Sequence, residues 1–96
     1  MGRYKDYEWD DAKDLVNRRK HGLPLIASAA ILDDPGCIVR PSPKSGLDEQ
    51  RLIAIGPVRG RLVTCIFVWR GQVRRIISVR YASRGERREY EEEKAR

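Results

Sequence analysis

The pattern of apolar and polar residues predicts helices in the first third of the chain. Between positions 10 and 21, apolar residues recur at intervals of three and four, which is the spacing of an amphipathic helix. Asp10 is suited to capping the start of this helix, and Gly22 to ending it. Arg19 falls on the side of the apolar stripe, so it must reach water or pair with an acid. The stripe consists of Trp9, Ala12, Leu15 and Val16.

A second, shorter helix is predicted to follow at once. Pro24 suits a first helical position, and the run LIASAAIL carries the helix to Leu32. The sequence DDPG then favours a turn over 33–36. Ahead of both helices, residues 4–8 are compatible with a short strand at the edge of a sheet.

From position 37 onward the chain is rich in β-branched residues, which predicts strands. Turn and loop sequences at 41–49, 57–60 and 70–72 separate four such runs, so we expect consecutive antiparallel strands with short connections. The third run is apolar on both faces and is expected to be central in the sheet. The four runs span 37–39, 51–56, 61–69 and 73–81.

Strict alternation along the last strand divides its side chains between two faces. One face would carry Val73, Ile77, Val79 and Tyr81, and the other Arg74, Ile76, Ser78 and Arg80. On this rule the two arginines, Arg74 and Arg80, share a face.

A third helix is predicted at the end of the chain. Ser83 and Glu86 form the S-x-x-E pattern of a capping box, and the run RREYEEEKAR continues the helix. Tyr90 is almost its only apolar residue, and the acidic run 91–93 is expected to be a frayed, solvated end. The elements together predict an α+β fold with two N-terminal helices, an antiparallel sheet of about four strands and a C-terminal helix, with room for one more short N-terminal strand.

Length and charge narrow the class of protein. A chain of 96 residues has room for one domain, so we expect a single domain over 1–96. It lacks the run of roughly 20 apolar residues that a membrane span needs and the apolar segment of a signal peptide, so a cytoplasmic protein without membrane contact is expected. The net charge is +6 and 15 of the 20 basic residues are arginine, which makes forked contacts to phosphate. This bias favours a nucleic-acid partner, although a basic surface also serves solubility alone.

Several kinds of chemistry find no support in the sequence. Cys37 and Cys65 stand apart in apolar runs, as buried small residues do, and form neither a disulfide framework nor a zinc site. Phosphate-binding glycine loops and zinc-protease motifs are absent. His21 is the single histidine, and no serine has a nucleophile setting. We therefore expect neither a metal nor a cofactor.

The polar side of the first helix carries one candidate site. Lys13, Asn17, Lys20 and His21 form a polar stripe beside the apolar one. A lysine and an imidazole at an exposed helix end suit a phosphate ligand. Alternatively, Lys20 and His21 only complement the helix C-terminus, and Gly22 completes the cap. The sequence does not separate the two interpretations.

A second candidate site combines Arg80, Glu86 and Tyr90. Glu86 and Tyr90 are one helical turn apart, and Arg80 ends the strand that leads into their helix. An arginine, a carboxylate and a phenol are the parts needed to cleave RNA without metal. The arginine stabilises the developing charge, and the other two groups serve as base and acid. In the simpler alternative, Glu86 serves only its capping box and Tyr90 only anchors the helix.

Four segments extend these observations over nearly the whole chain: YEWDDAKDLVNRRKHGL, LDDP, DEQRLIAIG and RIISVRYASRGERREYE. In this order they resemble the BrnT family of type II toxin-antitoxin ribonucleases. The chain departs from the family pattern at Val79, where alanine is common, and at 23–25, where a V-S-F type sequence is common. The polar residues of the family motif fall on Lys20, His21, Arg51, Arg80, Glu86 and Tyr90.

The resemblance implies a RelE-like α+β toxin that cleaves RNA and thereby inhibits translation and growth. It also implies a ribbon-helix-helix antitoxin, similar to BrnA, that holds the toxin inactive and through which the complex binds operator DNA. The main alternative is a non-catalytic module that binds nucleic acid or an acidic partner. Such a module would bind RNA with a steep salt dependence and leave it whole.

Residue roles within this set are hypotheses. We expect Arg80 and Arg51 to contact phosphate and the transition state, with Glu86 as the base. His21 or Lys20 would act as acid or electrostatic helper. Tyr90 would stack on a base or orient Glu86.

Overall fold

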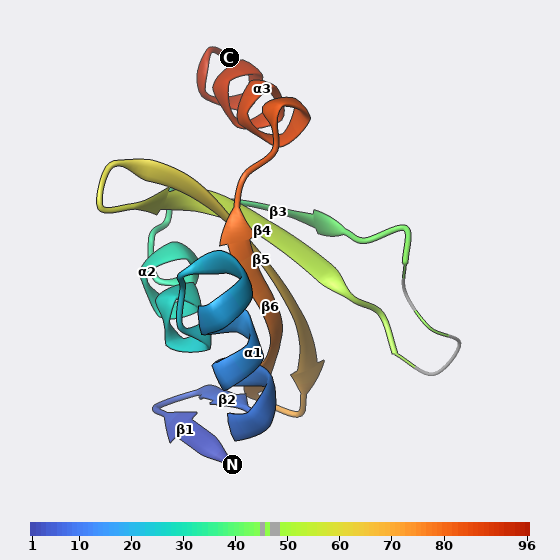
Figure 1. Cartoon of the computed structure of the whole chain (residues 1–96). Helices are drawn as coiled ribbons and strands as arrows, with labels where there is room; N and C mark the ends of the chain where they lie inside the picture. Colours follow the sequence, from blue (N-terminus) through green and yellow to red (C-terminus); the bar gives the residue numbers. More distant parts are fainter. Residues whose placement is uncertain (45, 47–48) are drawn as a thin grey trace.

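The computed structural model describes residues 1–44, 46 and 49–96 and shows an α+β fold built on a mixed sheet (Figure 1). Within this part of the chain the sheet has six strands in the spatial order β1-β2-β6-β5-β4-β3. The α+β class is confirmed, while the predicted count of about four strands is wrong. The strands are β1 (Gly2–Tyr4), β2 (Tyr7–Trp9), β3 (Ile38–Pro41), β4 (Leu52–Val58), β5 (Arg61–Arg70) and β6 (Val73–Tyr81).

The two additional strands form an N-terminal hairpin where a single strand over 4–8 was expected. β1 and β2 pair antiparallel around a turn in which Lys5 has a φ of 51°. β2 then lies parallel to β6, which makes the sheet mixed. Tyr7 attaches this short hairpin to the rest of the fold, because the residue is only 2% exposed and belongs to the main core. Strands of three residues are too short for an alternation pattern to reveal them.

The other four strands follow the prediction closely. β3, β4, β5 and β6 pair antiparallel in sequence order, and β5 lies between β4 and β6 in the interior of the sheet. The predicted loop over 41–49 begins inside β3, since Pro41 ends that strand. Positions 45, 47 and 48 of this loop lie outside the described residues.

The first helix has the predicted bounds. α1 spans Asp11–His21; the Asp10 carboxylate accepts from the Lys13 N–H at 3.0 Å, and Gly22 ends the helix with a φ of 72°. The second helix begins later than expected, because Pro24 is still extended at φ −76° and ψ 153°. A short 3₁₀ turn, η1 (Leu25–Ala27), leads into α2 (Ser28–Leu32). In the described residues, no helix has the length and apolar character needed to cross a membrane.

The side of α1 that faces the fold is polar. Leu15 and Val16 are 56% and 58% exposed, so most of the apolar stripe read from the sequence faces water. Asn17 is buried at 6% exposure and lies against the edge of β6. Its amide nitrogen donates to the carbonyl oxygens of Leu23 (2.8 Å) and Val79 (2.7 Å), and its oxygen accepts from the Val79 N–H at 3.3 Å.

Asp14 supports the same orientation of α1. Its carboxylate accepts from the Leu25 N–H at 2.7 Å and pairs with Arg18 at 3.1 Å. A buried amide and a nearly buried carboxylate that find backbone partners outweigh the burial of two aliphatic side chains, because unpaired polar groups in the interior are costly. Periodicity alone could not predict this inversion.

A bulge in β6 changes which side chains share a face. Ile66 pairs with Ser78 and Phe67 with Ile76, which leaves Ile77 as an extra residue. The prediction that Arg74 and Arg80 share a face is therefore wrong. The Arg74 guanidinium stacks on Tyr7, on the face of the sheet that α1 and α2 cover. Arg80 pairs with Thr64 and lies on the opposite face.

The two faces of the sheet carry separate cores. α1, η1 and α2 cover one face, and α3 (Arg84–Lys94) lies over the other (Figure 1). The larger core includes Leu25, Ile31, Val63, Cys65, Phe67 and Val79 on the first face. The smaller core comprises Ile53, Ile55 and Ala82, with Tyr90 of α3 packed against them. α3 is thus attached to the sheet by little apolar area.

The C-terminal helix starts as predicted and ends at Lys94, near the end of the chain as expected. Ser83 Oγ accepts from the Glu86 N–H at 3.2 Å, while the Ser83 N–H donates to the Glu86 carboxylate at 2.8 Å, which completes the capping box. The acidic run 91–93 is exposed as expected, but it is helical and not frayed. Arg87 donates to the Ala82 carbonyl at 2.9 Å and thereby fastens the first turn.

Candidate active site

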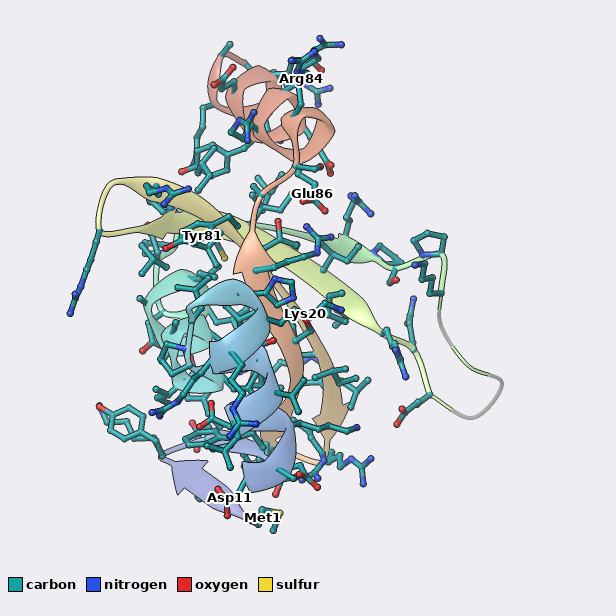
Figure 2. The ribbon with its side chains drawn as sticks, viewed as in Figure 1. Met1, Asp11, Lys20, Tyr81, Arg84 and Glu86 are labelled. Carbon is teal, nitrogen blue, oxygen red and sulfur yellow. The ribbon has the colours of Figure 1, made fainter. Side chains whose placement is uncertain are left out.

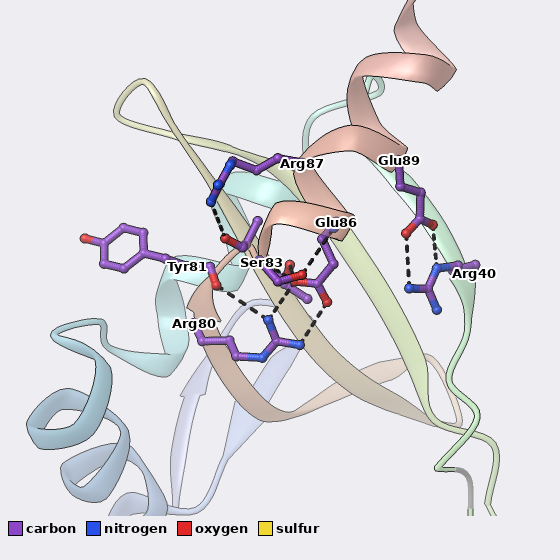
Figure 3. Close-up of polar contacts among 9 residues, drawn as sticks. Arg40, Arg80, Tyr81, Ser83, Glu86, Arg87 and Glu89 are labelled. Carbon is purple, nitrogen blue, oxygen red and sulfur yellow. Dashed lines mark hydrogen bonds and ion pairs between the residues drawn. The ribbon is translucent and has the colours of Figure 1, made fainter.

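Arg80 and Glu86 form the central ion pair of the candidate site. The two guanidinium nitrogens of Arg80 donate to the two carboxylate oxygens of Glu86 at 2.7 and 2.9 Å (Figure 3). This is the forked geometry that arginine forms with carboxylates. Arg80 reaches the pair from β6 and Glu86 from the first turn of α3, so a short connection brings two elements together as the sequence predicted.

Two further donors complete the surroundings of Glu86. Thr64 Oγ1 of β5 donates to the carboxylate at 3.0 Å, and the Ser83 N–H donates at 2.8 Å. Burial by itself would raise the pKa of Glu86, but the hydrogen bonds from Arg80, Ser83 and Thr64 outweigh it and lower the pKa to about 2. The same pair raises the pKa of Arg80 above its already high ordinary value. Both groups are therefore fully charged at neutral pH.

A second arginine-carboxylate pair lies one turn further along α3. Arg40 of β3 donates to the two carboxylate oxygens of Glu89 at 2.5 and 3.1 Å (Figure 3). Hydrogen bonding to Glu89 raises the pKa of Arg40. Arg40 shares its face of β3 with Ile38, which belongs to the smaller core. Sequence reasoning missed this residue, although its alternation with Ile38 places it on the α3 side.

The Arg80–Glu86 pair borders an open hollow of about 240 Å³. Arg40 and Lys44 lie at its rim, and the apolar side chains of Ile53 and Ile66 form its floor. The hollow therefore combines three cationic side chains with an apolar base. A phosphate binds to cationic side chains and a nucleobase packs on apolar ones, so this hollow offers contacts to both.

Lys20 and His21 lie at a neighbouring hollow of about 310 Å³ between α1 and β6. Ser78 also lines this hollow, and it shares its face of β6 with Arg80 two residues on, since Ile66 and Thr64 are their partners. Side chains two residues apart on a strand are separated by roughly 7 Å. The hollow at the end of α1 therefore lies along the stretch of β6 that leads to Arg80. Figure 2 shows Lys20 at the end of α1 and Glu86 at the start of α3.

The remaining two predicted site residues lie at the margins. Arg51 immediately precedes β4, and its carbonyl oxygen accepts from the Ser42 N–H at 2.8 Å. Ser42 lines the hollow beside Arg80, so the backbone of Arg51 is close to the site. Tyr90 packs on the smaller core, with the Lys94 ammonium 5.2 Å from its ring centroid. It shares the sheet-facing side of α3 with Glu86, as the helical spacing predicted.

Two contributors to the site, Thr64 and Arg40, were not found from the sequence, and the role of Asn17 was not foreseen. Thr64 is fully buried in a run of apolar residues, and a buried hydroxyl in a central strand is a signal that a polar partner is near. Arg40 carries the alternation signal described above. Asn17 was recognised as part of a polar stripe, but its structural part, holding α1 against β6, was not foreseen.

A comparison with known protein families finds a match over most of the chain. Residues 9–86 match the family model described as the ribonuclease toxin BrnT of a type II toxin-antitoxin system. The chain belongs to the BrnT family. The matched BrnT region begins at Trp9 and ends at Glu86, so it contains α1, the whole of β3 to β6 and the Arg80–Glu86 pair. A search of curated proteins gave no match. The described residues of this BrnT family member contain no group of three or more histidine, cysteine, aspartate or glutamate side chains suited to hold a metal ion.

Proposed function

We propose that this chain is a toxin that cleaves RNA without a metal ion and thereby inhibits translation and growth. Its neutralising partner is a ribbon-helix-helix antitoxin of the BrnA kind, and operator DNA is bound only through the antitoxin. Membership of the BrnT family supports the ribonuclease activity and the toxin-antitoxin pairing. The single observation that carries the mechanism is the Arg80–Glu86 pair beside an open cationic hollow.

Arg80 is the phosphate-binding and charge-stabilising residue in this proposal. Its side chain remains 32% exposed beside the hollow, and Glu86 uses only part of its five N–H donors. A pre-oriented guanidinium costs little reorganisation when negative charge develops on the phosphorane. Lys44 adds positive charge at the same hollow, and we expect Arg51, whose backbone lies beside Ser42, to help to hold a neighbouring phosphate.

Cleavage proceeds by attack of the ribose 2′-oxygen on phosphorus. A base takes the 2′-OH proton as the new O–P bond forms, and the P–O5′ bond breaks as an acid gives a proton to the departing oxygen. Atoms and charge then balance with a cyclic phosphate and a free 5′-hydroxyl as products. No co-reactant is required.

Glu86 suits positioning better than proton transfer. A carboxylate with a pKa of about 2 whose oxygens accept from Arg80, Thr64 and Ser83 is a weak base. We therefore give Glu86 the part of orienting Arg80. Proton transfer falls to His21 in this proposal, because imidazole is the side chain that most often serves as general acid and base, with Lys20 as electrostatic helper. Tyr90 acts as the anchor of α3.

The test compares arginine variants on a labelled single-stranded RNA in EDTA. The wild-type chain is expected to cleave the RNA, and Arg80→Gln to cleave it on the order of 100-fold more slowly, because a transition-state charge partner is removed. Arg75→Gln is the matched control, since Arg75 lies on the same strand and pairs with Glu8 at 3.6 Å. It should stay within about threefold of wild type.

Thermal unfolding and the RNA product decide between the possible outcomes. Arg80→Lys keeps a charge without the fork, so folded Arg80→Lys with slow cleavage would separate chemistry from folding. RNA left whole by the wild-type chain, with tight salt-dependent binding, would instead support the non-catalytic binding module. Full cleavage by folded Arg80→Gln would overturn the assignment of Arg80.

A further inference from the structure

The outward face of α1 is an apolar surface without a cover. Leu15 and Val16 are 56% and 58% exposed, and Ala12, about one helical turn earlier, is exposed as well. In an ordinary surface helix such residues face the core. Here the inward side is occupied by Asn17 and Asp14, whose backbone hydrogen bonds fix the rotation of the helix. These hydrogen bonds therefore hold the apolar residues on the outward side of α1.

The charges next to this face are cationic. Lys13, Arg19 and Lys20 are all exposed on α1, and no salt bridge in the described part of the chain involves any of them. The carboxylates on the same helix are already paired: Asp11 with the N-terminal amine at 2.8 Å and Asp14 with Arg18 at 3.1 Å. The face thus combines exposed aliphatic carbon with three cations that lack an ion-pair partner.

This surface continues into the hollow that contains Lys20 and His21. Ala12, Lys13, Val16 and Lys20 line the hollow between α1 and β6, together with His21 and Ser78. Ser78 is two residues from Arg80 on the same face of β6. A partner seated on α1 would therefore cover the hollow that contains His21, the proposed proton-transfer residue.

We propose that this α1 face is the docking surface for the antitoxin, through a segment that carries apolar side chains flanked by carboxylates. The inference rests on the proposed toxin function and adds the surface and the chemistry of the partner. An exposed apolar patch rimmed by charge is characteristic of protein interaction sites. Carboxylates opposite Lys13, Arg19 and Lys20 provide the electrostatic complement.

The same features disfavour the other occupants. RNA would find cations here, but Leu15 and Val16 offer nothing to a phosphate backbone. A second copy of the chain would bring Lys13, Arg19 and Lys20 of each protomer together, and like charges across an interface cost several kcal/mol. An acidic, partly apolar partner satisfies both parts of the surface.

The experiment measures binding of the purified antitoxin, the product of the gene adjacent to that of this chain, by isothermal titration. Leu15→Glu is the probe variant, because glutamate is a good helix former and Leu15 does not line the hollow. We expect the variant to bind the antitoxin at least about tenfold more weakly than wild type. Val39→Glu is the matched control, since Val39 is an exposed apolar residue at 49% on β3, and it should bind within about threefold.

Further measurements keep the outcomes distinct. Wild-type antitoxin affinity in folded Leu15→Glu would overturn the docking surface, even where wild-type RNA cleavage upholds the proposed function. A loss of RNA binding by Leu15→Glu with unchanged antitoxin binding would assign the face to RNA and overturn the proposal. A wild-type dimer that dissociates in Leu15→Glu, measured by light scattering, would assign it to a second copy. Absence of RNA cleavage by wild type would refute the proposed function alone.

Discussion

Glu86 is 8% exposed and keeps its charge because four hydrogen bonds from three residues reach its two oxygens. One carboxylate thereby caps α3, orients Arg80 and satisfies the Thr64 hydroxyl. The same hydrogen bonds make it a stability determinant.

The pH dependence of stability follows from the pKa of Glu86. Its pKa is about 2 in the folded chain and 4.5 in the reference state, so the ionised carboxylate stabilises the fold fully above about pH 5. This contribution, on the order of 3 kcal/mol, is lost as the pH falls from about 4.5 to about 2. In urea unfolding, Glu86→Gln should be less stable than wild type by about this amount at pH 7, and the difference should shrink by pH 3.

Glu93→Gln is the control for this measurement. Glu93 is an exposed carboxylate on the same helix, 3.6 Å from Arg96 at a solvated end. Such pairs contribute little, so Glu93→Gln should match wild type at both pH values. A constant difference between Glu86→Gln and wild type from pH 7 to pH 3 would contradict the linkage argument.

At the level of secondary structure elements, α3 is the least firmly packed helix. It projects from the end of β6 and lies over the sheet face opposite α1 and α2 (Figure 1). Its attachments are the Glu86 and Glu89 ion pairs and the packing of Tyr90. A helix held by two ion pairs and one aromatic ring is a candidate for local unfolding below the global free energy of unfolding.

Tyr90→Ala should loosen α3 while the sheet stays folded. Removing this half-buried ring lowers the local opening free energy by about 2 kcal/mol, which corresponds to about thirtyfold faster amide exchange in α3. Hydrogen exchange by mass spectrometry checks this, with β5 as the internal reference. Tyr4→Ala, at an exposed tyrosine of 45%, should leave α3 unchanged.

The conservative variant separates packing from chemistry at the same position. Tyr90→Phe keeps the ring and removes only the hydroxyl, so α3 protection and RNA cleavage should both be retained. A severe loss of cleavage in Tyr90→Phe would show that the hydroxyl acts in the reaction and would contradict the anchor role.

Local signals in the sequence were sufficient for most elements. The cap residues Asp10 and Ser83 and the β-branched runs located α1, α3 and four strands to within a few residues. Two features depend on tertiary contacts and could not be predicted from the sequence. The bulge at Ile77 reversed the face of everything before it, and alternation cannot reveal a bulge because the extra residue is specified by the neighbouring strand. The rotation of α1 was set by buried hydrogen bonds of Asn17.

The candidate site was predictable to the extent that its parts are close in sequence. Arg80 and Glu86 are six residues apart across a strand end and a capping box, so their meeting followed from local structure. Thr64 and Arg40 reach the site through strand pairing over long separations. Register between distant strands is what a single sequence specifies least.

At the scale of the whole molecule, the net charge is +6, and the cations differ in whether they are paired with a carboxylate. Arg40, Arg75 and Arg80 are each paired with a carboxylate, whereas the exposed α1 cations Lys13, Arg19 and Lys20 are in no salt bridge within the described residues. In the proposed function, the exposed cations attract RNA at long range, and the hollow beside Arg80 binds it specifically.

The salt dependence of RNA binding should report this division. For single-stranded RNA the slope of log affinity against log salt changes by about 0.7 for each phosphate that the protein neutralises. Arg80→Gln should therefore reduce the slope by about 0.7, as measured by fluorescence anisotropy at several salt concentrations. Arg75→Gln, whose charge is paired with Glu8 away from the hollow, should keep the wild-type slope. Equal slopes for wild type and Arg80→Gln would exclude direct binding of a phosphate by Arg80.

The pairing of Asn17 with Val79 has a consequence for how the molecule behaves in a crowded solution. Beyond Arg75, β6 has no neighbouring strand on its β2 side among the described residues, and an open strand edge is a template for intermolecular strand addition and aggregation. The Asn17 amide imitates a peptide group and occupies both the N–H and the carbonyl of Val79. One side chain on a helix thus occupies the two backbone groups of Val79 that an added strand would need for hydrogen bonds, and so opposes strand addition at this position.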